Sequence, residues 1–296
     1  GVLSMPARLQ LHLAVVLFGA AGLMGKLIAL SAMQLVLGRT LIGALALALF
    51  MTLFSKSEQG RWWALSGRAE QFLPLVISGL VLACHWWTFF HAIQLAGVGV
   101  AVVGFSAFPV FVTLLEAGLQ GRRVQAMDGL TTAMVVLGLW LVAPTISWQN
   151  AAFQGLAWGV ISGALFAVLV LLNKTLVLVF GGLRLGFWQQ ALAAAVCCCL
   201  LVDTGSFAIS RQDGMYLLLL GVLLTAVPHA LFIACLKQIR AHTAALVTSL
   251  EPVYAIVFAW LLLAEQPTLT TLLGAAIILA AVVLGHWYQN TVKASL

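Results

Sequence analysis

The sequence contains ten apolar stretches in two sets of five, and the fourth stretch of each set repeats the same residues around a proline. Phe89, Ala101, Ser106, Pro109, Val110 and Leu119 recur at a constant offset as Phe232, Ala244, Ser249, Pro252, Val253 and Leu262. Five crossings end on the side of a membrane opposite to their start, so the second set must enter inverted. Inverted repeats build sites that open alternately to either face. The pattern predicts a transporter of two inverted five-helix repeats, residues 1–147 and 148–296.

Composition indicates a membrane protein. Hydrophobic residues make up 63% of the chain and charged residues 7%, whereas soluble domains contain about 25% charged residues. Because each span needs about 20 apolar residues, ten spans use most of the 296 residues. The runs are too long and too uniformly apolar for the strands of a barrel. We therefore expect an all-α polytopic protein, with transmembrane helices that begin near Leu9, Ala32, Phe72, Gly97, Gln125, Ala152, Leu185, Met215, His242 and Thr268.

The basic residues fall in the amino terminus, in alternate connections and in the carboxyl terminus. They are Arg8, Lys56, Arg61, Arg68, Arg122, Arg123, Lys174, Arg184, Lys237, Arg240 and Lys293. The opposite connections hold Arg211, with the acidic residues Asp203, Asp213 and Glu265 nearby. The positive-inside rule then predicts a multi-pass protein of the cytoplasmic (inner) membrane with both termini in the cytoplasm. This distribution explains the net charge of +6 without nucleic acid as a partner.

The third stretch carries the densest polar and aromatic run of the chain, which includes His85, Trp86 and Phe89. His85 and Phe89 share one face of a helix, and Trp86 lies on the next face. We expect the His85 face to line a central cavity. The alternative is that the histidines are hydrogen-bonded to neighbouring helices. Trp158, in the sixth stretch, is also deep enough to form a wall of this cavity.

Three charged residues lie within predicted spans, where an unpaired charge costs at least about 2.5 kcal/mol. Lys26 and Arg39 lie near the outer boundary, so each contacts a substrate carboxylate or extends its head group to the interface. Glu251 lies halfway along the ninth span, directly before Pro252. It is a candidate proton carrier, and its structural alternative is a hydrogen bond to a carbonyl that the proline leaves without a donor. The first repeat has Phe108 at the matching position, and we expect Phe108 to contribute to substrate binding.

Prolines and glycines mark other positions of interest. Pro109, Pro228 and Pro252 interrupt three spans and predict bends, either as hinges of moving half-helices or as static kinks. His229 follows Pro228 near mid-membrane and is a further cavity candidate. The stripe of Gly155, Gly159 and Gly163 permits close helix packing, which we expect within the bundle of a monomer. A dimer face on this stripe is the alternative.

Several motifs resemble the ten-helix transporters of the drug/metabolite transporter superfamily that are built from two EamA domains. They are Ser249-Leu250-Glu251-Pro252-Val253, Trp260-Leu261-Leu262-Leu263-Ala264-Glu265, Leu273-Gly274-Ala275-Ala276-Ile277-Ile278-Leu279-Ala280 and, more weakly, Phe18-Gly19, Lys26 and Gly38-Arg39-Thr40. The first repeat departs from the pattern. Phe108-Pro109 replaces Glu-Pro, Gly121-Arg122 lacks the corner glutamate, and Phe18 stands where tryptophan is common. The resemblance implies a carrier with a central cavity that exports or exchanges small molecules such as amino acids.

Deep aromatic side chains beside histidines and a few cations favour a small amphiphilic zwitterion. We expect export or exchange of aromatic or large neutral amino acids, with the lipid bilayer as the other partner, no cofactor or metal, and no enzymatic activity. One alternative is a drug or cation exporter, which would depend on Glu251 rather than on Lys26 or Arg39. Alternatives of another class are a receptor or scaffold, or an intramembrane serine protease using Gly104-Phe105-Ser106-Ala107.

Overall fold

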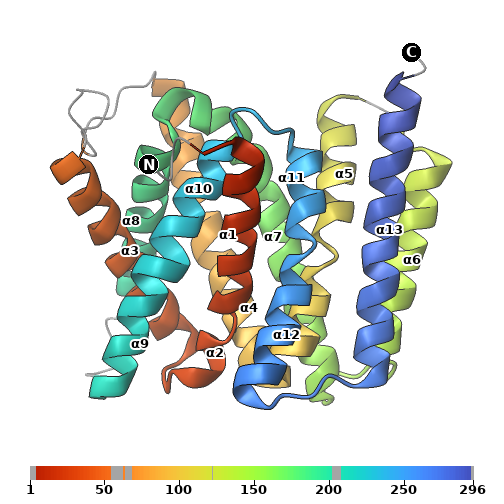
Figure 1. The fold of residues 1–296 in the computed structure, drawn as a ribbon, viewed down its shortest axis with the longest axis horizontal. Coiled ribbons are helices and arrows are strands. Elements are labelled where there is room, and N and C mark those ends of the chain that lie inside the picture. Colours follow the sequence, from red (N-terminus) through yellow and green to blue (C-terminus); the bar gives the residue numbers. More distant parts are fainter. Residues whose placement is uncertain (1–4, 55–62, 64–68, 122, 202–207, 295–296) are drawn as a thin grey trace.

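The computed structural model describes residues 5–54, 63, 69–121, 123–201 and 208–294. Within these ranges every regular element is a helix, and the helices stand side by side in one bundle (Figure 1). Eight helical segments are long and apolar enough to cross a membrane. The predicted all-helical class is confirmed. Lys56, Arg61, Arg68, Arg122 and Asp203 of the predicted charge pattern lie outside the described residues, as does the side chain of Lys293.

The helices of the first half are α1 (Ala7–Ala21), α2 (Met24–Leu27), α3 (Ala32–Phe54), the 3-10 helix η3 (Ala69–Gln71), α4 (Phe72–Phe105), α5 (Phe108–Leu119) and α6 (Ala126–Val142). The helices of the second half follow a similar order. They are α7 (Ala151–Phe180), α8 (Gly182–Leu201), α9 (Arg211–Gly221), the π-helix η4 (Val222–Ala226), α10 (Val227–Cys235), α11 (Ala241–Thr248), α12 (Glu251–Leu263) and α13 (Leu269–Ala294). The long helix α4 of the first half packs mainly against α7 and α8 of the second half.

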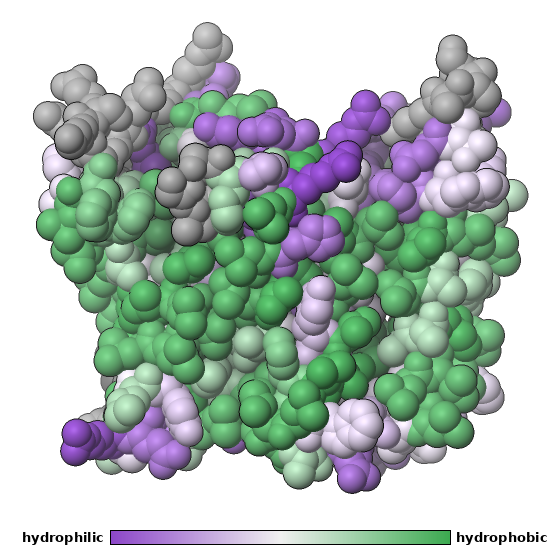
Figure 2. Space-filling view, in the orientation of Figure 1, coloured by the Kyte–Doolittle hydropathy of each residue, from purple (hydrophilic) through white to green (hydrophobic). Residues whose placement is uncertain are grey.

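The two ends of the bundle differ in what they contain. Helix α1 begins and α13 ends at the same end, the upper one in Figure 1, which we call the terminal end. The opposite, far end holds α2, the start of α9 and the connection from α12 to α13. Figure 2 shows a broad apolar band around the middle of the bundle, with hydrophilic residues gathered above and below it. This is the surface expected of a bundle whose sides face lipid.

At the far end, α4 is broken at Gly97. Gly97 has φ +87° and ψ 171°, a conformation that residues with a Cβ atom rarely adopt. The chain turns here, and the following backbone is held by Glu265, whose Oε1 accepts a hydrogen bond from the Gly99 N–H at 2.9 Å. The third and fourth predicted spans therefore meet at Gly97, where the sequence placed the start of the fourth.

We expect Gly97→Ala to destabilise the protein by about 1–3 kcal/mol, the typical cost of such backbone strain. An added Cβ would also lie 2.8 Å from Oε1 of Glu265. The measurement is thermal unfolding of the purified protein in detergent. Gly118→Ala is the matched control, because its Cβ would meet nothing within 4 Å. Equal unfolding temperatures for the two variants would contradict the prediction.

Two of the three predicted bends at prolines are breaks between separate helices. Pro109 and Pro252 each occupy the second residue of a helix, α5 and α12, where the missing N–H has no intrahelical partner to lose. At the preceding breaks, the Ser106 hydroxyl donates to the Val102 carbonyl at 2.7 Å, and the Ser249 hydroxyl donates to the carbonyl of Leu246. The two repeats therefore break at matching positions. Pro228 differs: it is the second residue of α10, which continues directly from the π-helix η4 without a break.

The glycine stripe of α7 faces α4. A Cβ at Gly159 would lie 2.5 Å from the Ala101 carbonyl oxygen, and a Cβ at Gly104 would lie 2.5 Å from the Leu156 carbonyl oxygen. The two backbones are therefore in direct contact, which only small residues allow. The prediction that the stripe packs within the bundle is confirmed.

Candidate functional site

A small cavity lies in the centre of the bundle, enclosed by α1, α3, α4, α7, α10 and α12. Its volume of about 20 Å³ has room for about one water molecule. The lining residues come from both halves of the chain: Phe18, Ala21, Arg39, Leu82, His85, Trp86, Phe89, Phe105, Phe166, Leu169, His229 and Glu251. The structure thus brings together six residues proposed from the sequence, namely Arg39, His85, Trp86, Phe89, His229 and Glu251. Helix α3, the second predicted span, contributes Arg39 to the wall.

Arg39 is the buried cation of the cavity, with 2% of its surface exposed. Its Nε donates to Oγ1 of Thr225 at 2.9 Å, and its Nη2 donates to the Leu224 carbonyl at 3.3 Å. That carbonyl is available because Pro228, four residues later, has no N–H to donate. The guanidinium also lies 3.9 Å from the centroid of the Trp86 ring, which is a favourable cation–π distance. Arg39 therefore does not extend to the interface; its charge is held at the cavity.

Glu251 is the buried carboxylate of the cavity, with 6% of its surface exposed. It is the first residue of α12, directly after the break at Ser249. Arg39 lines the same cavity and is close enough to act on Glu251 electrostatically. Among the residues that the structure describes, no hydrogen bond or ion pair engages the Glu251 carboxylate. One buried positive and one buried negative group thus face the same small cavity without neutralising each other in a direct ion pair.

His85 is fixed by helix α7. Its Nδ1 lies 3.0 Å from the Ser162 carbonyl and 2.8 Å from the Ser162 hydroxyl, while that hydroxyl donates back to the His85 carbonyl at 3.0 Å. Because a carbonyl only accepts and the hydroxyl proton is used in this way, Nδ1 carries a hydrogen and donates it to Ser162. His85 therefore lines the cavity, as expected, and it is also hydrogen-bonded to a neighbouring helix, which was the alternative.

His229 is fixed by a chain of neutral polar groups. Gln189 donates through Nε2 to Oγ of Ser78 at 2.9 Å and to Oδ1 of Asn173 at 2.5 Å. Its Oε1 is left to accept from Nε2 of His229 at 3.1 Å, which defines the tautomer of a neutral ring. The His229 ring also lies 5.5 Å from the Trp86 ring in an edge contact. The network joins α4, α7, α8 and α10 behind the cavity.

Aromatic rings form the remainder of the wall. The Phe166 ring lies 5.1 Å from the His85 ring and 5.4 Å from that of Phe105. On the other side of Phe166, the Phe232 ring lies at 5.6 Å, and Phe18 follows it at 5.9 Å. The cavity thus combines two opposite charges and two histidines with a largely aromatic surface.

Three of the residues proposed from the sequence do not line this cavity. Phe108 is completely buried and stacks on Phe105 at 5.1 Å, one layer behind the wall. Trp158 lies toward the far end, where its ring is 5.3 Å from those of Trp87 and His91. Lys26 is exposed on the short helix α2 and lines a separate hollow at the far end.

The sequence interpretation missed Gln189, Asn173, Ser78, Ser162 and Thr225, which are all completely or almost completely buried. The available signal was a neutral polar residue within an apolar stretch, as in Gln189-Gln190. That signal is weak because a single hydroxyl or amide is easily satisfied within its own helix. Only the contacts between helices show that these side chains hold the histidines and the arginine of the site.

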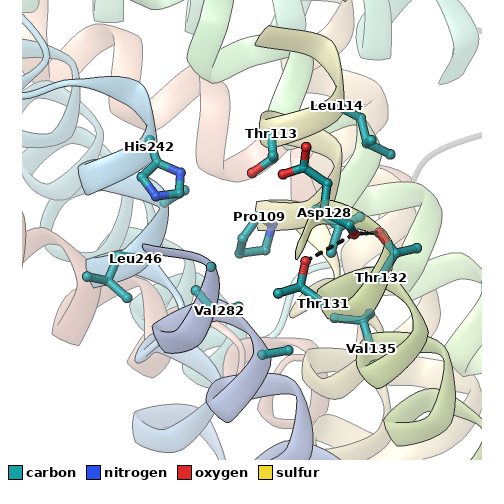
Figure 3. A pocket seen from close by; sticks show the side chains of 14 residues that line it. Pro109, Thr113, Leu114, Asp128, Thr131, Thr132, Val135, His242, Leu246 and Val282 are labelled. Atoms are coloured by element: carbon teal, nitrogen blue, oxygen red, sulfur yellow. Dashed lines mark hydrogen bonds between the residues drawn. The ribbon is translucent and has the colours of Figure 1, made fainter. Parts of the chain in front are cut away.

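Figure 3 shows a second cavity, of about 30 Å³, between α5, α6, α11 and α13. His242 lies on one side of it, and Asp128, Thr131 and Thr132 lie on the other. Both threonine hydroxyls donate to the backbone carbonyl of Asp128, at 3.1 and 2.7 Å. None of the residues proposed from the sequence for substrate binding lines this cavity. Within the described part of the chain, no group of three or more His, Cys, Asp or Glu residues is placed to hold a metal ion.

Comparison with known proteins agrees with this architecture. Residues 6–143 and 153–285 each match the EamA-like transporter family. The threonine/homoserine exporter RhtA of Salmonella typhimurium strain LT2 is 29% identical over 227 residues, which cover 74% of this chain and 72% of the exporter. An uncharacterized transporter of Archaeoglobus fulgidus is 28% identical over 197 residues, or 67% of this chain and 70% of that protein. A crystal structure described only as that of a protein shares the fold, with a TM-score of 0.70 and 16% identity over 97% of this chain and 98% of its own.

Proposed function

The chain belongs to the EamA-like transporter family, and we propose that it exports or exchanges small amphiphilic metabolites, with aromatic or large neutral amino acids as the main substrates. The apolar helices and the family together identify a multi-pass membrane protein. The observation that carries the proposal is the central cavity, which is lined by the buried residues Arg39 and Glu251 of different halves of the chain. Relatives that export threonine and homoserine support an amino acid as the solute.

The charges of the cavity match those of an amino acid. In this proposal the Arg39 guanidinium binds the substrate carboxylate, because its planar fork of donors fits a carboxylate. Glu251 binds the substrate ammonium or carries a proton in its place. The rings of Trp86, Phe89 and Phe166 surround the substrate side chain. A cation exporter, the alternative from the sequence, is disfavoured because the buried Arg39 would repel a cation in this space.

The volume of the cavity supports alternating access. About 20 Å³ is far too small for an amino acid, so substrate enters only when the surrounding helices separate. Pro109, Pro228 and Pro252 each lack a backbone N–H and so provide positions where half-helices can bend during transport. The two halves rock about this cavity and expose it to each side in turn.

We propose ten crossings, arranged as inverted repeats in residues 1–147 and 148–296. The segment Ala69–Leu119 spans 51 residues, and its break at Gly97 makes it two crossings. The shorter apolar helix Ala126–Val142 makes one more. An even number of crossings agrees with α1 beginning and α13 ending at one end of the bundle (Figure 1). The basic residues of that end, such as Arg123, Lys237 and Arg240, favour its placement in the cytoplasm.

Efflux of labelled phenylalanine and threonine from proteoliposomes, with and without a pH gradient, tests the proposal. If Glu251 carries the coupled proton, Glu251→Gln is expected to lose the gradient-dependent part of the flux, because an amide neither binds nor releases a proton near neutral pH. Glu70→Gln is the matched control, since Glu70 lies in η3, away from the cavity. Flux that responds to neither gradient nor substitution would make the protein a facilitator with a structural Glu251. Absence of flux for every amino acid would refute the proposed substrate class.

A further inference from the structure

We propose that the far end of the protein carries a second, outer docking site for zwitterions, in which Lys26 binds the carboxylate and Glu265 binds the ammonium group. The choice of solute rests on the proposed function. The site itself rests on a hollow, separate from the central cavity, that these two residues line together.

The hollow has a volume of about 520 Å³, which lies within the range of about 300–1,000 Å³ typical of small-molecule sites. It is formed where α2, the break of α4, the start of α7 and the connection from α12 to α13 meet. Apart from Lys26 and Glu265, its surface is made mostly of small or apolar residues such as Ala96, Gly97 and Ala151. It therefore has room for a whole amino acid, whereas the central cavity of about 20 Å³ does not.

Glu265 is held in place by the backbone of the opposite half. Its Oε1 accepts the hydrogen bond from Gly99 at 2.9 Å, and this fixes the carboxylate at the break of α4. Among the described residues, no hydrogen bond engages its Oε2. The carboxylate therefore retains an oxygen that is able to accept a hydrogen bond from a ligand ammonium.

Lys26 supplies the opposite charge. Its side chain is exposed on α2 and, within the described part of the chain, makes no hydrogen bond or ion pair. No ion pair joins Lys26 to Glu265, although both line the same hollow. Two opposite charges that share a hollow without neutralising each other favour a ligand that carries both charges. An α-amino acid is the simplest ligand of this kind.

The position of the hollow gives the site its role. With the terminal end in the cytoplasm, the hollow faces the outside, at the end from which an exported solute leaves. A solute bound there occupies the exit, so external amino acid is expected to slow net efflux at concentrations in the millimolar range. Exposed ion pairs are individually weak, which agrees with a site of low affinity that releases its ligand readily.

The test uses a single reporter cysteine in the hollow, Ala151→Cys, with the exposed Cys84, Cys198 and Cys199 changed to alanine. Proteoliposomes are treated from outside with a membrane-impermeant methanethiosulfonate, and the rate of labelling is measured with and without external ligand. The probes are L-phenylalanine, which has both charges, phenethylamine, which lacks the carboxylate, and 3-phenylpropionate, which lacks the ammonium group. L-phenylalanine is expected to slow labelling more than either analogue.

Two substitutions test separately what the charge of Lys26 and the charge of Glu265 contribute to binding. Lys26→Gln and Glu265→Gln are each expected to weaken the protection by L-phenylalanine by about two- to five-fold. Glutamine at 265 retains an oxygen that accepts the hydrogen bond from Gly99, so the fold is kept. Arg211→Gln is the matched control, because Arg211 is an exposed cation at the far end that does not line the hollow.

Efflux measured in the same liposomes distinguishes the two proposals. Protection without amino-acid flux would support the docking site and refute the proposed transport. Flux without protection would support the transport and overturn the docking site. Equal protection by all three probes, or protection that survives both substitutions, would also overturn the site.

Discussion

Replacing Arg39 with leucine is expected to weaken strongly the apparent affinity with which amino acids are exported. The guanidinium is buried beside the central cavity, bonded to Thr225 and Leu224 and stacked over Trp86. Leucine removes the proposed partner of the substrate carboxylate and leaves Glu251 without its opposite charge. Loss of a buried charge partner costs about 2 kcal/mol or more, which corresponds to at least a thirty-fold weaker apparent affinity.

The measurement is the concentration of L-phenylalanine that gives half-maximal efflux from proteoliposomes. Arg39→Lys separates a binding role from a structural one, because lysine keeps the charge but lacks the planar fork of donors. We expect it to fold as the wild type does and to transport with weakened affinity. Arg211→Leu removes an exposed arginine that lines neither the central cavity nor the hollow at the far end, so it is expected to have no effect. Wild-type affinity in Arg39→Leu would refute the proposed contact with the carboxylate.

The sequence was sufficient to predict where prolines disturb helices but not the contacts made at these positions. Pro228 showed that one carbonyl in the eighth stretch loses its helical donor. Arg39, the residue that donates to this carbonyl, is more than 180 residues away along the chain, so only tertiary structure shows the pairing. Glu251 is a similar case. Its depth in a predicted span was clear from the sequence, but the side chains that surround it are known only from the tertiary structure.

The position of Trp158 illustrates a second limit of the sequence. Periodicity places Trp158 next to the glycine stripe, and a residue one step away on a helix points about 100° to the side. Because the stripe itself packs against α4, Trp158 is turned toward Trp87 and His91. Depth in the membrane is therefore readable from the sequence, whereas the rotation of a helix about its axis depends on which face its neighbours cover.

Substitution of Gly159, which lies outside the site, is expected to cause a large loss of stability. Its added Cβ would lie 2.5 Å from the Ala101 carbonyl oxygen and 3.1 Å from the Cα of Gly104. These atoms belong to the backbone of α4 and cannot move aside as a flexible side chain does. Gly159→Ala therefore forces α4 and α7 apart, at a typical cost of about 1–3 kcal/mol, and Gly159→Leu is expected to prevent folding.

The comparison that isolates this effect is Gly129→Ala. Gly129 also lies within a helix, α6, and its Cβ would meet nothing within 4 Å. Alanine has a helix propensity better than that of glycine by about 1 kcal/mol, so this control is expected to unfold at the same temperature as the wild type or higher. Gly159→Ala gains the same propensity and is expected to unfold at a lower temperature, because the loss of packing is larger. If both variants gained stability, the contact between α4 and α7 would have to be looser than the structure shows. The two helices would then be free to slide during transport instead of moving as one unit.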